Sequence, residues 1–223
     1  MIKYFIEEEW FGIVFRDPVT ALTNLLTFIL TLWCFRKLRR AELNEIDSGW
    51  RWFFLFMGIS ALMAIVVHGF SYYTPVKVHA GIWIFMCLVQ GLGITFAQRA
   101  TVQRYFSEQN KKTWLLVPVI QFAVFAALLV TIQSYTVTKI HVAVGLVPLM
   151  VWYTIQHFSG NPSGAGIASG ILVASLTAFI HGFKLSFSDW FNYNDISHVV
   201  ICIALWLMCK GVLRKNLATA TAE

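Results

Sequence analysis

Long runs of apolar residues, separated by short polar segments, dominate the pattern along the chain. Seven such runs predict helices at roughly Val19–Phe35, Trp50–Phe70, Val78–Phe96, Trp114–Ile132, Thr138–Ile155, Ala165–Ile180 and Ile196–Val212. Most of them reach the length of about 17 residues that an α-helix needs to cross the roughly 30 Å core of a bilayer. Because the runs follow one another almost without pause, we expect an all-α polytopic membrane protein with a single seven-helix transmembrane domain over residues 1–223.

The composition favours the same class. Hydrophobic residues make up 58% of the 223 residues and charged residues only 13%, and a soluble domain of this length has too little interior to bury so many apolar side chains. The four cysteines lie within or at the edge of apolar runs, so we expect them to be packing residues rather than a disulfide framework. The acidic N-terminus lacks the basic start of a secretory signal, so the first helix is expected to be retained.

The distribution of Lys and Arg predicts the orientation of the helices. Twelve of these residues flank the runs on one side, and the other side has Lys3, Arg16, Lys77, Lys139 and Lys184. The richer side should be cytoplasmic, which puts the N-terminus outside and the C-terminus inside. The net charge of +6 is then explained by topology and contact with lipid headgroups, and nothing in the sequence indicates a nucleic-acid partner.

Two similar stretches, Val66–Gly81 and Phe179–Val200, place histidines at the mouths of apolar runs. In each stretch an apolar run ends in His-Gly-Phe, and a second histidine opens the next run, which gives His68, His79, His181 and His198. In the predicted topology all four lie at the outer face together with His141, whereas His157 lies on the cytoplasmic side. A single histidine fits an interfacial or hydrogen-bonding role, but several at one level are typical of a site for zinc or another borderline metal.

Polar residues near these histidines admit two interpretations. Asn194 and Asp195 precede His198 by four and three residues and share its helix face if the helix starts early enough. Asp195 could therefore orient a metal-bound histidine or hold the water of the metal, or it could be a first-turn acid that stabilises the helix start. Asp17, directly before Pro18, is expected to cap the first helix.

The order of these motifs resembles the CREST superfamily of membrane hydrolases, which includes the alkaline ceramidases and the progestin and adiponectin receptors. In the first helix, alkaline ceramidases carry an acidic residue followed seven residues on by Asn, and "DPVTALTN" similarly supplies Asp17 and Asn24, with Thr20 and Thr23 between them. The resemblance implies that these two residues support a zinc site. The stretch "NYNDISHVV" also resembles a bacterial branch of small membrane proteins, which implies a bacterial inner or plasma membrane.

The resemblance also implies roles for the histidines. His68 matches a zinc ligand at the end of the second helix, and His198 matches the second histidine of a His-x-x-x-His motif in the seventh. Asn194 stands where the family has the first histidine of that motif, and His79 stands where it has the Asp that holds the zinc-bound water. His79 or His181 would then complete a set of three histidine ligands and leave one position open for water.

The acidic N-terminus carries a weaker resemblance. Glu7, Glu8 and Glu9 with Trp10 are similar to the calcium-binding N-terminus of alkaline ceramidases, which would add Ca²⁺ as a second cation. A solvated acidic arm is the alternative interpretation of the same residues.

The leading functional hypothesis is a zinc-dependent membrane hydrolase that cleaves an amide or ester bond of a membrane lipid. Zinc would activate a water molecule, with Asp195 as general base and Asn194 as donor to the oxyanion. The alternatives are a non-enzymatic metal-binding membrane receptor or structural module, and a haem b protein with two of the outer histidines as axial ligands. The sequence does not specify the oligomeric state.

Overall fold

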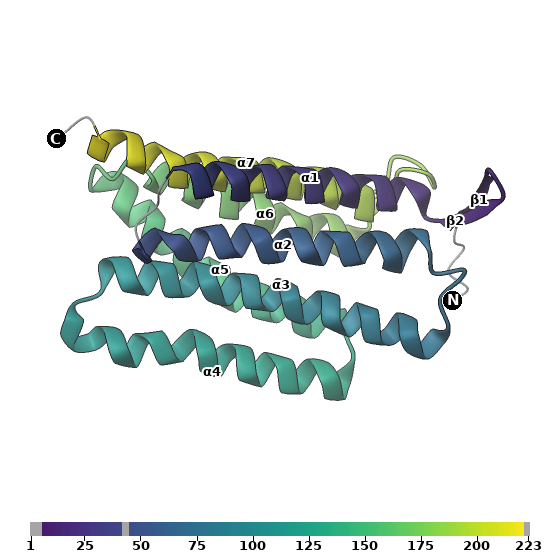
Figure 1. Cartoon of the computed structure of the whole chain (residues 1–223), viewed down its shortest axis with the longest axis horizontal. Coiled ribbons are helices and arrows are strands. Elements are labelled where there is room, and N and C mark those ends of the chain that lie inside the picture. The colour runs from purple at the N-terminus through teal and green to yellow at the C-terminus, as the bar shows by residue number, and fades with distance from the viewer. Residues whose placement is uncertain (1–5, 42–44, 221–223) are drawn as a thin grey trace.

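The structure is a computed structural model that describes residues 6–41 and 45–220. In this part of the chain, seven α-helices and one short β-hairpin are joined by short loops (Figure 1). The helices are α1 (Pro18–Arg40), α2 (Glu45–Gly69), α3 (Val76–Tyr105), α4 (Glu108–Ile132), α5 (Tyr135–Phe158), α6 (Gly164–Phe183) and α7 (Tyr193–Ala220). Each contains a stretch long and apolar enough to cross a membrane. The predicted all-α fold with seven such helices is confirmed, and the orientation in the bilayer stays a prediction.

Most helices run further than the apolar pattern predicts. α3 continues past Phe96 to Tyr105, and α4 begins at Glu108, six residues before Trp114. Once a helix is nucleated, each further residue adds one backbone hydrogen bond at little cost, so the polar residues that follow an apolar run lengthen the helix beyond that run. Lys3, which the charge count includes, lies outside the described residues.

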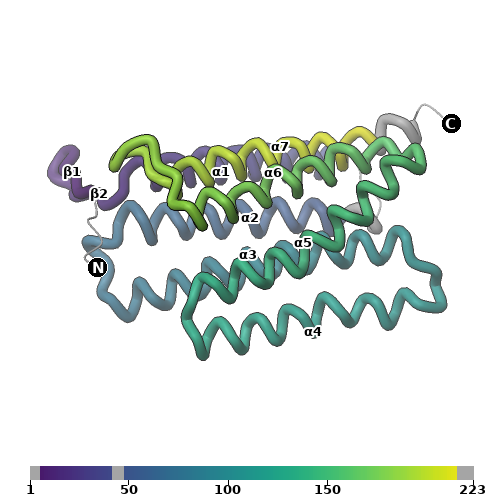
Figure 2. The backbone as a smooth tube through the Cα atoms, turned by 180° about the vertical axis from the view of Figure 1, so that it is seen from behind, coloured from purple at the N-terminus to yellow at the C-terminus, as the bar shows by residue number. Residues whose placement is uncertain are grey.

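The helices form a bundle in which sequence neighbours pack side by side. α1 packs against both α2 and α7, α7 packs against α6, and α3 packs against α2, α4 and α5. α4 lies at the edge of the bundle, against α3 and α5 (Figures 1 and 2). As the first and last of seven alternating spans, α1 and α7 run parallel, and their contact brings the first and last helices of the chain together.

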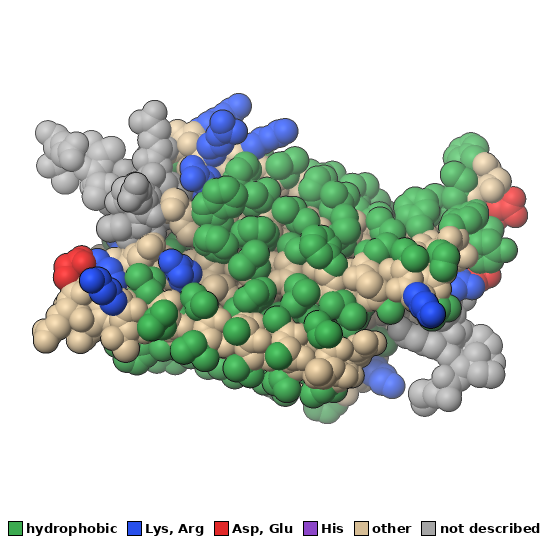
Figure 3. Space-filling model, turned by 60° about the horizontal axis from the view of Figure 1, so that its bottom comes forward, with side chains coloured by type: hydrophobic (Ala, Val, Ile, Leu, Met, Phe, Trp, Pro, Cys, Tyr) green, Lys and Arg blue, Asp and Glu red, His purple; other side chains and the backbone are tan. Residues whose placement is uncertain are grey.

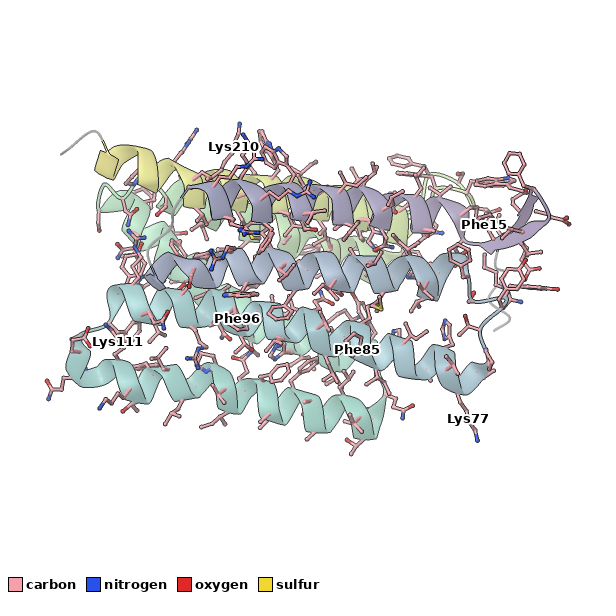
Figure 4. All side chains as sticks on the ribbon, viewed as in Figure 1. Phe15, Lys77, Phe85, Phe96, Lys111 and Lys210 are labelled. Atoms are coloured by element: carbon pink, nitrogen blue, oxygen red, sulfur yellow. The ribbon has the colours of Figure 1, made fainter. Side chains whose placement is uncertain are left out.

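The two ends of the bundle differ in character (Figure 4). We call the end that carries Phe15 and Lys77 the hairpin end and the end that carries Lys111 the basic end. At the basic end the largest buried side chains gather around Trp50 and Tyr153, and Trp50 Nε1 donates to Tyr153 Oη at 3.3 Å. Between the ends, apolar side chains cover the surface (Figure 3), as lipid contact requires.

Glycines allow the closest helix approach. A Cβ atom on Gly166 would lie 2.6 Å from the Cα atom of Gly211, and a Cβ atom on Gly170 would lie 2.7 Å from the carbonyl oxygen of Ala204. These distances are too short for any side chain, so the small-x-x-x-small pair of α6 lets its backbone touch that of α7.

The acidic N-terminal segment is a β-hairpin, which the sequence pattern did not predict. β1 (Glu7–Trp10) pairs antiparallel with β2 (Ile13–Arg16). Phe11 and Gly12 form the turn, both at positive φ, as two-residue hairpin turns require. Glu7 is ion-paired with Arg16, with Oε1 and Nε 2.6 Å apart. Successive strand residues point to opposite faces, so the three glutamates do not share one face; calcium binding there stays a prediction.

Candidate functional site

Polar side chains of α1 and α7 meet in a constant register near the hairpin end. Three pairs, which we call the polar seam, join the helices: Thr20 Oγ1 and Asp195 Oδ1 at 2.7 Å, Thr23 Oγ1 and His198 Nδ1 at 3.0 Å, and Thr27 Oγ1 and Cys202 Sγ at 3.2 Å. Members of every pair are 175 positions apart in the sequence, as expected for parallel helices in register. The spacings of three and four residues keep each set on one helix face.

The Nδ1 atom of His198 lies between a hydroxyl that can accept and an amide that can only donate a hydrogen bond. Thr23 Oγ1 donates its own hydrogen to the Thr20 carbonyl at 3.0 Å, so it can accept from Nδ1–H. Asn24 Nδ2 lies 3.3 Å from Nδ1 and also donates to the Thr20 carbonyl at 2.9 Å. If Thr23 accepts from Nδ1–H, the proton of His198 is on Nδ1 and the lone pair of Nε2 can bind a metal. If Asn24 donates to Nδ1 instead, the proton is on Nε2.

Asp195 is fully buried and completes the start of α7. Its Oδ1 accepts from Thr20 and its Oδ2 accepts from the backbone N–H of Asn192 at 2.8 Å. Asn192 Oδ1 in turn accepts from the backbone N–H of Asn194 at 2.9 Å. The two side chains therefore form a capping box with an aspartate at its third helical position. Of the two interpretations of Asp195, the structure shows the first-turn acid, and its role as general base stays a prediction.

His68, at the end of α2, lies against His198. Their ring centroids are 6.3 Å apart and their planes meet at 70°. Two imidazoles bound to one tetrahedral zinc at about 2.0–2.1 Å place their centroids about 5 Å apart, so the pair is about 1 Å too wide, a difference that small side-chain rotations cover. Among the described residues, no group of three or more His, Cys, Asp or Glu is placed to hold a metal. The spacing of the two rings is close to that of two zinc ligands, and zinc binding by His68 and His198 stays a prediction.

The other two predicted ligands have different neighbours. His79 Nε2 lies 3.1 Å from the carbonyl oxygen of Val67, which ties the start of α3 to the end of α2. The ring of His181 lies near those of Tyr193 and Tyr135, with centroids 5.3 Å and 6.3 Å away. The structure thus brings two of the four histidines into ring contact and gives the other two their own partners.

The expectation that His141 shares this level is wrong. His141 is buried, its Nε2 lies 3.3 Å from the carbonyl oxygen of Gly91, and its ring stacks on Phe125 with centroids 4.1 Å apart. Gly91 lies twelve residues along α3 from His79, roughly 18 Å by helical rise. The predicted hydrogen-bonding role of His141 is confirmed, and it belongs to a separate amide–imidazole network with Gln121 and Gln98.

Asp17 and Asn24, the predicted supporting residues, differ in outcome. Asn24 is buried and lies beside His198. Asp17 occupies the N-cap position of α1 with φ 46° and ψ 57°, and its side chain makes no capping hydrogen bond. A capping side chain needs an extended backbone to reach the free N–H groups, and the left-handed conformation of Asp17 prevents this.

The first helix carries a sequence signal for the polar seam. Thr20, Thr23, Thr27 and Thr31 recur every three or four residues along an otherwise apolar helix, and all are buried. Such a stripe predicts a helix contact with polar partners. The identity of that partner, α7, follows only from the fold.

Comparisons with known proteins identify the family of the chain. The sequence profile of the "Family of unknown function (DUF6962)" matches residues 19–217, and the chain belongs to that family. No curated protein and no solved structure matches the chain.

Proposed function

We propose that this member of the DUF6962 family is a membrane-embedded hydrolase that cleaves an amide or ester bond of a lipid at the His68–His198 pair. The observation that carries the proposal is the contact between two imidazoles from different membrane-spanning helices. Polar side chains within apolar spans are costly and tend to mark function. The resemblance of His68 and His198 to the zinc-ligand positions of the ceramidase-like pattern supports the same chemistry.

His68 and His198 would hold a zinc ion, which lowers the pKa of its bound water toward about 7 and polarises a carbonyl group. Thr23 keeps the proton of His198 on Nδ1 when it accepts, so Nε2 can face the ion. Asp195 positions His198, because its bonds to Thr20 and to the N–H of Asn192 fix the first turn of α7 against α1. Its remaining lone pairs support the predicted role as general base.

The surroundings suit a lipid substrate. A hollow lined by Leu185, Ser186, Phe187 and Ile196 opens beside the first turn of α7, the helix that also carries His198. Its mostly apolar lining suits an acyl chain. With the N-terminus outside, as the Lys and Arg distribution predicts, the site faces the non-cytoplasmic side of what we propose is a bacterial inner or plasma membrane.

A specific observation supports a second function, a non-enzymatic metal-binding receptor or structural module. Both oxygens of Asp195 and the Nδ1 atom of His198 are engaged in contacts between or within helices. In such a module these contacts would hold the hairpin end together, and metal binding would tighten α2 against α7 without turnover.

Release of fatty acid from ceramides, N-acyl amides and lysolipids by the purified protein separates the two functions. For the hydrolase we expect product with the wild type, no product with His68→Ala or His198→Ala, and full activity with His157→Ala, whose exposed side chain lies at the basic end. Bound zinc without turnover of any of these lipids would support the receptor instead. Turnover that survives both alanine substitutions would overturn the proposed site.

A further inference from the structure

The basic end carries one motif twice, on neighbouring parallel helices. Trp33 precedes Lys37 by four residues on α1, and Trp206 precedes Lys210 by four residues on α7. Lys37 Nζ lies 5.7 Å from the ring centroid of Trp33, and Lys210 Nζ lies 3.7 Å from that of Trp206. All four side chains are exposed. Each helix therefore presents an ammonium group over an indole ring, a cation–π pair.

The two pairs lie at nearly the same depth. The 175-residue register of the polar seam places Lys210 beside position 35 of α1. Lys37 is two residues further on, about 3 Å along the helix axis. The two ammonium groups therefore approach the membrane surface at one level.

The two pairs also point to the same side of the bundle. At about 100° per residue, Lys37 lies roughly 80° from Thr27 around α1, and Lys210 lies roughly 80° from Cys202 around α7 in the opposite sense. Thr27 and Cys202 face each other, so opposite rotations on parallel helices bring both lysines to one side of the contact line. Figure 4 places Lys210 on the surface of the bundle over these two helices.

The two lysines have no carboxylate partner in the part of the chain that the structure describes. Arg40 and Arg214 add two further exposed cations one turn nearer the helix ends. Figure 3 shows Lys and Arg side chains gathered where the apolar surface ends.

The surface below the lysines is apolar on the same side. Leu26 of α1 is 52% exposed, and Val199 and Ile203 of α7 are 40% and 49% exposed. By the same helix geometry these side chains flank the α1–α7 contact line on the side of the two lysines. A headgroup-sized positive site thus continues into a strip that suits hydrocarbon chains.

We propose that this surface binds one anionic phospholipid, with its phosphate between Lys37 and Lys210 and its acyl chains along the α1–α7 contact line. Charge complementarity selects the anionic headgroup, because each lysine near the membrane surface attracts such a lipid. Trp33 and Trp206 lie at the level of the glycerol backbone, where indole rings are favoured. The site is independent of the histidine pair at the opposite end of the bundle.

Native mass spectrometry of the full-length protein in a zwitterionic detergent tests the site, with phosphatidylglycerol and phosphatidylcholine as probes. We expect one phosphatidylglycerol to bind with clear preference, and Lys37→Gln/Lys210→Gln to weaken it by about 30-fold, roughly fivefold for each lysine. The matched control, Lys77→Gln/Lys139→Gln, removes one lysine at the hairpin end and one in the first turns of α5, whose Nζ lies 5.9 Å from the ring centroid of Tyr135. This control should bind as the wild type does.

Three results would overturn the proposal. Equal affinity for phosphatidylglycerol and phosphatidylcholine would show that the anionic headgroup is not recognised. Equal weakening of binding in the control variant would show that only the overall charge of the protein matters. Displacement by glycerol 3-phosphate at the same concentration as the lipid would show a free-anion site. The charge-preserving variant Lys37→Arg/Lys210→Arg should retain binding. If the glutamine variant unfolds, Trp206→Leu takes its place and should weaken phosphatidylglycerol binding severalfold. Unchanged binding by Trp206→Leu would also contradict the site.

Discussion

Replacing Thr23 with Val and, separately, Asn24 with Leu tests how the protein prepares His198 for metal binding. Thr23 Oγ1 is the closer neighbour of Nδ1, at 3.0 Å against 3.3 Å for Asn24 Nδ2. Valine keeps the shape of threonine but removes the hydroxyl oxygen that accepts from His198 Nδ1–H. Without that acceptor, the tautomer with its proton on Nδ1 and a free lone pair on Nε2 is no longer favoured. Loss of a group that orients a metal-binding histidine typically weakens metal affinity by about 10–100-fold, equivalent to roughly 1.4–2.7 kcal/mol.

Asn24→Leu should act in the other direction. The amide can only donate to Nδ1, so it favours the tautomer with the proton on Nε2, which competes with metal binding. Without it we expect zinc affinity to be unchanged or higher. The structural cost of either change should be small, since hydrogen bonds between membrane helices contribute about 0.6 kcal/mol on average.

Competition for zinc between the purified variants and a chromogenic chelator measures both effects, with thermal unfolding in detergent as a check on folding. We expect zinc to bind more weakly to Thr23→Val than to the wild type, and Asn24→Leu to show no such loss. A loss of affinity in Asn24→Leu equal to or greater than that in Thr23→Val would refute it, because the amide rather than the hydroxyl would then prepare the ring.

Three further predictions concern stability, each measured by unfolding in detergent with increasing denaturant. Thr20→Val and Asp195→Asn should be coupled in a double-mutant cycle by about 1–2 kcal/mol, near the upper end for membrane hydrogen bonds, because the pair is buried and charge-assisted; independent effects would contradict a stabilising Thr20–Asp195 hydrogen bond. Gly166→Ala should destabilise the protein by more than about 2 kcal/mol, because its Cβ atom would meet the α7 backbone at 2.6 Å. Gly182→Ala, with no atom within 4 Å of the added Cβ, should be neutral, and equal effects would speak against the α6–α7 contact. Gln121→Leu should cost about 1–2 kcal/mol and increase proteolysis of α4, since it removes the amide–imidazole network that joins this edge helix to α3 and α5; an unchanged cleavage pattern would argue against that role.

The sequence predicts the helices well because each is an apolar run that is long enough to cross a bilayer, a local property that packing does not alter. The hairpin at Glu7–Arg16 escaped prediction because its strands have four residues each and its turn has Phe11 before Gly12 rather than the usual Asn-Gly. The predicted level of His141 is wrong for a different reason. The distance of a residue from the start of its helix gives its depth in the bundle only if all helices begin at one plane. α4 and α5 meet well inside the hairpin end (Figure 1), so a residue near the start of α5 lies deeper than one near the start of α3.

In the candidate site, too, the features that depend on local sequence could be predicted, and those that depend on packing between helices could not. His68 and His198 were predicted because a repeated motif placed them at helix ends, and their contact follows from the packing of α1 against both α2 and α7. Asp195 had two sequence interpretations, and only the contact with Thr20 shows how it is used. The register between α1 and α7 depends on tertiary packing, so neither local pattern nor hydropathy could supply the partner of each threonine.

X-ray absorption at the zinc edge of the purified protein tests most directly whether His68 and His198 bind a metal together. We expect bound zinc with two imidazole nitrogens at about 2.0–2.1 Å, lost in His68→Ala/His198→Ala and kept in His157→Ala. Zinc that stays bound with the same spectrum after both histidines are removed, or a wild-type protein that takes up no zinc, would contradict it.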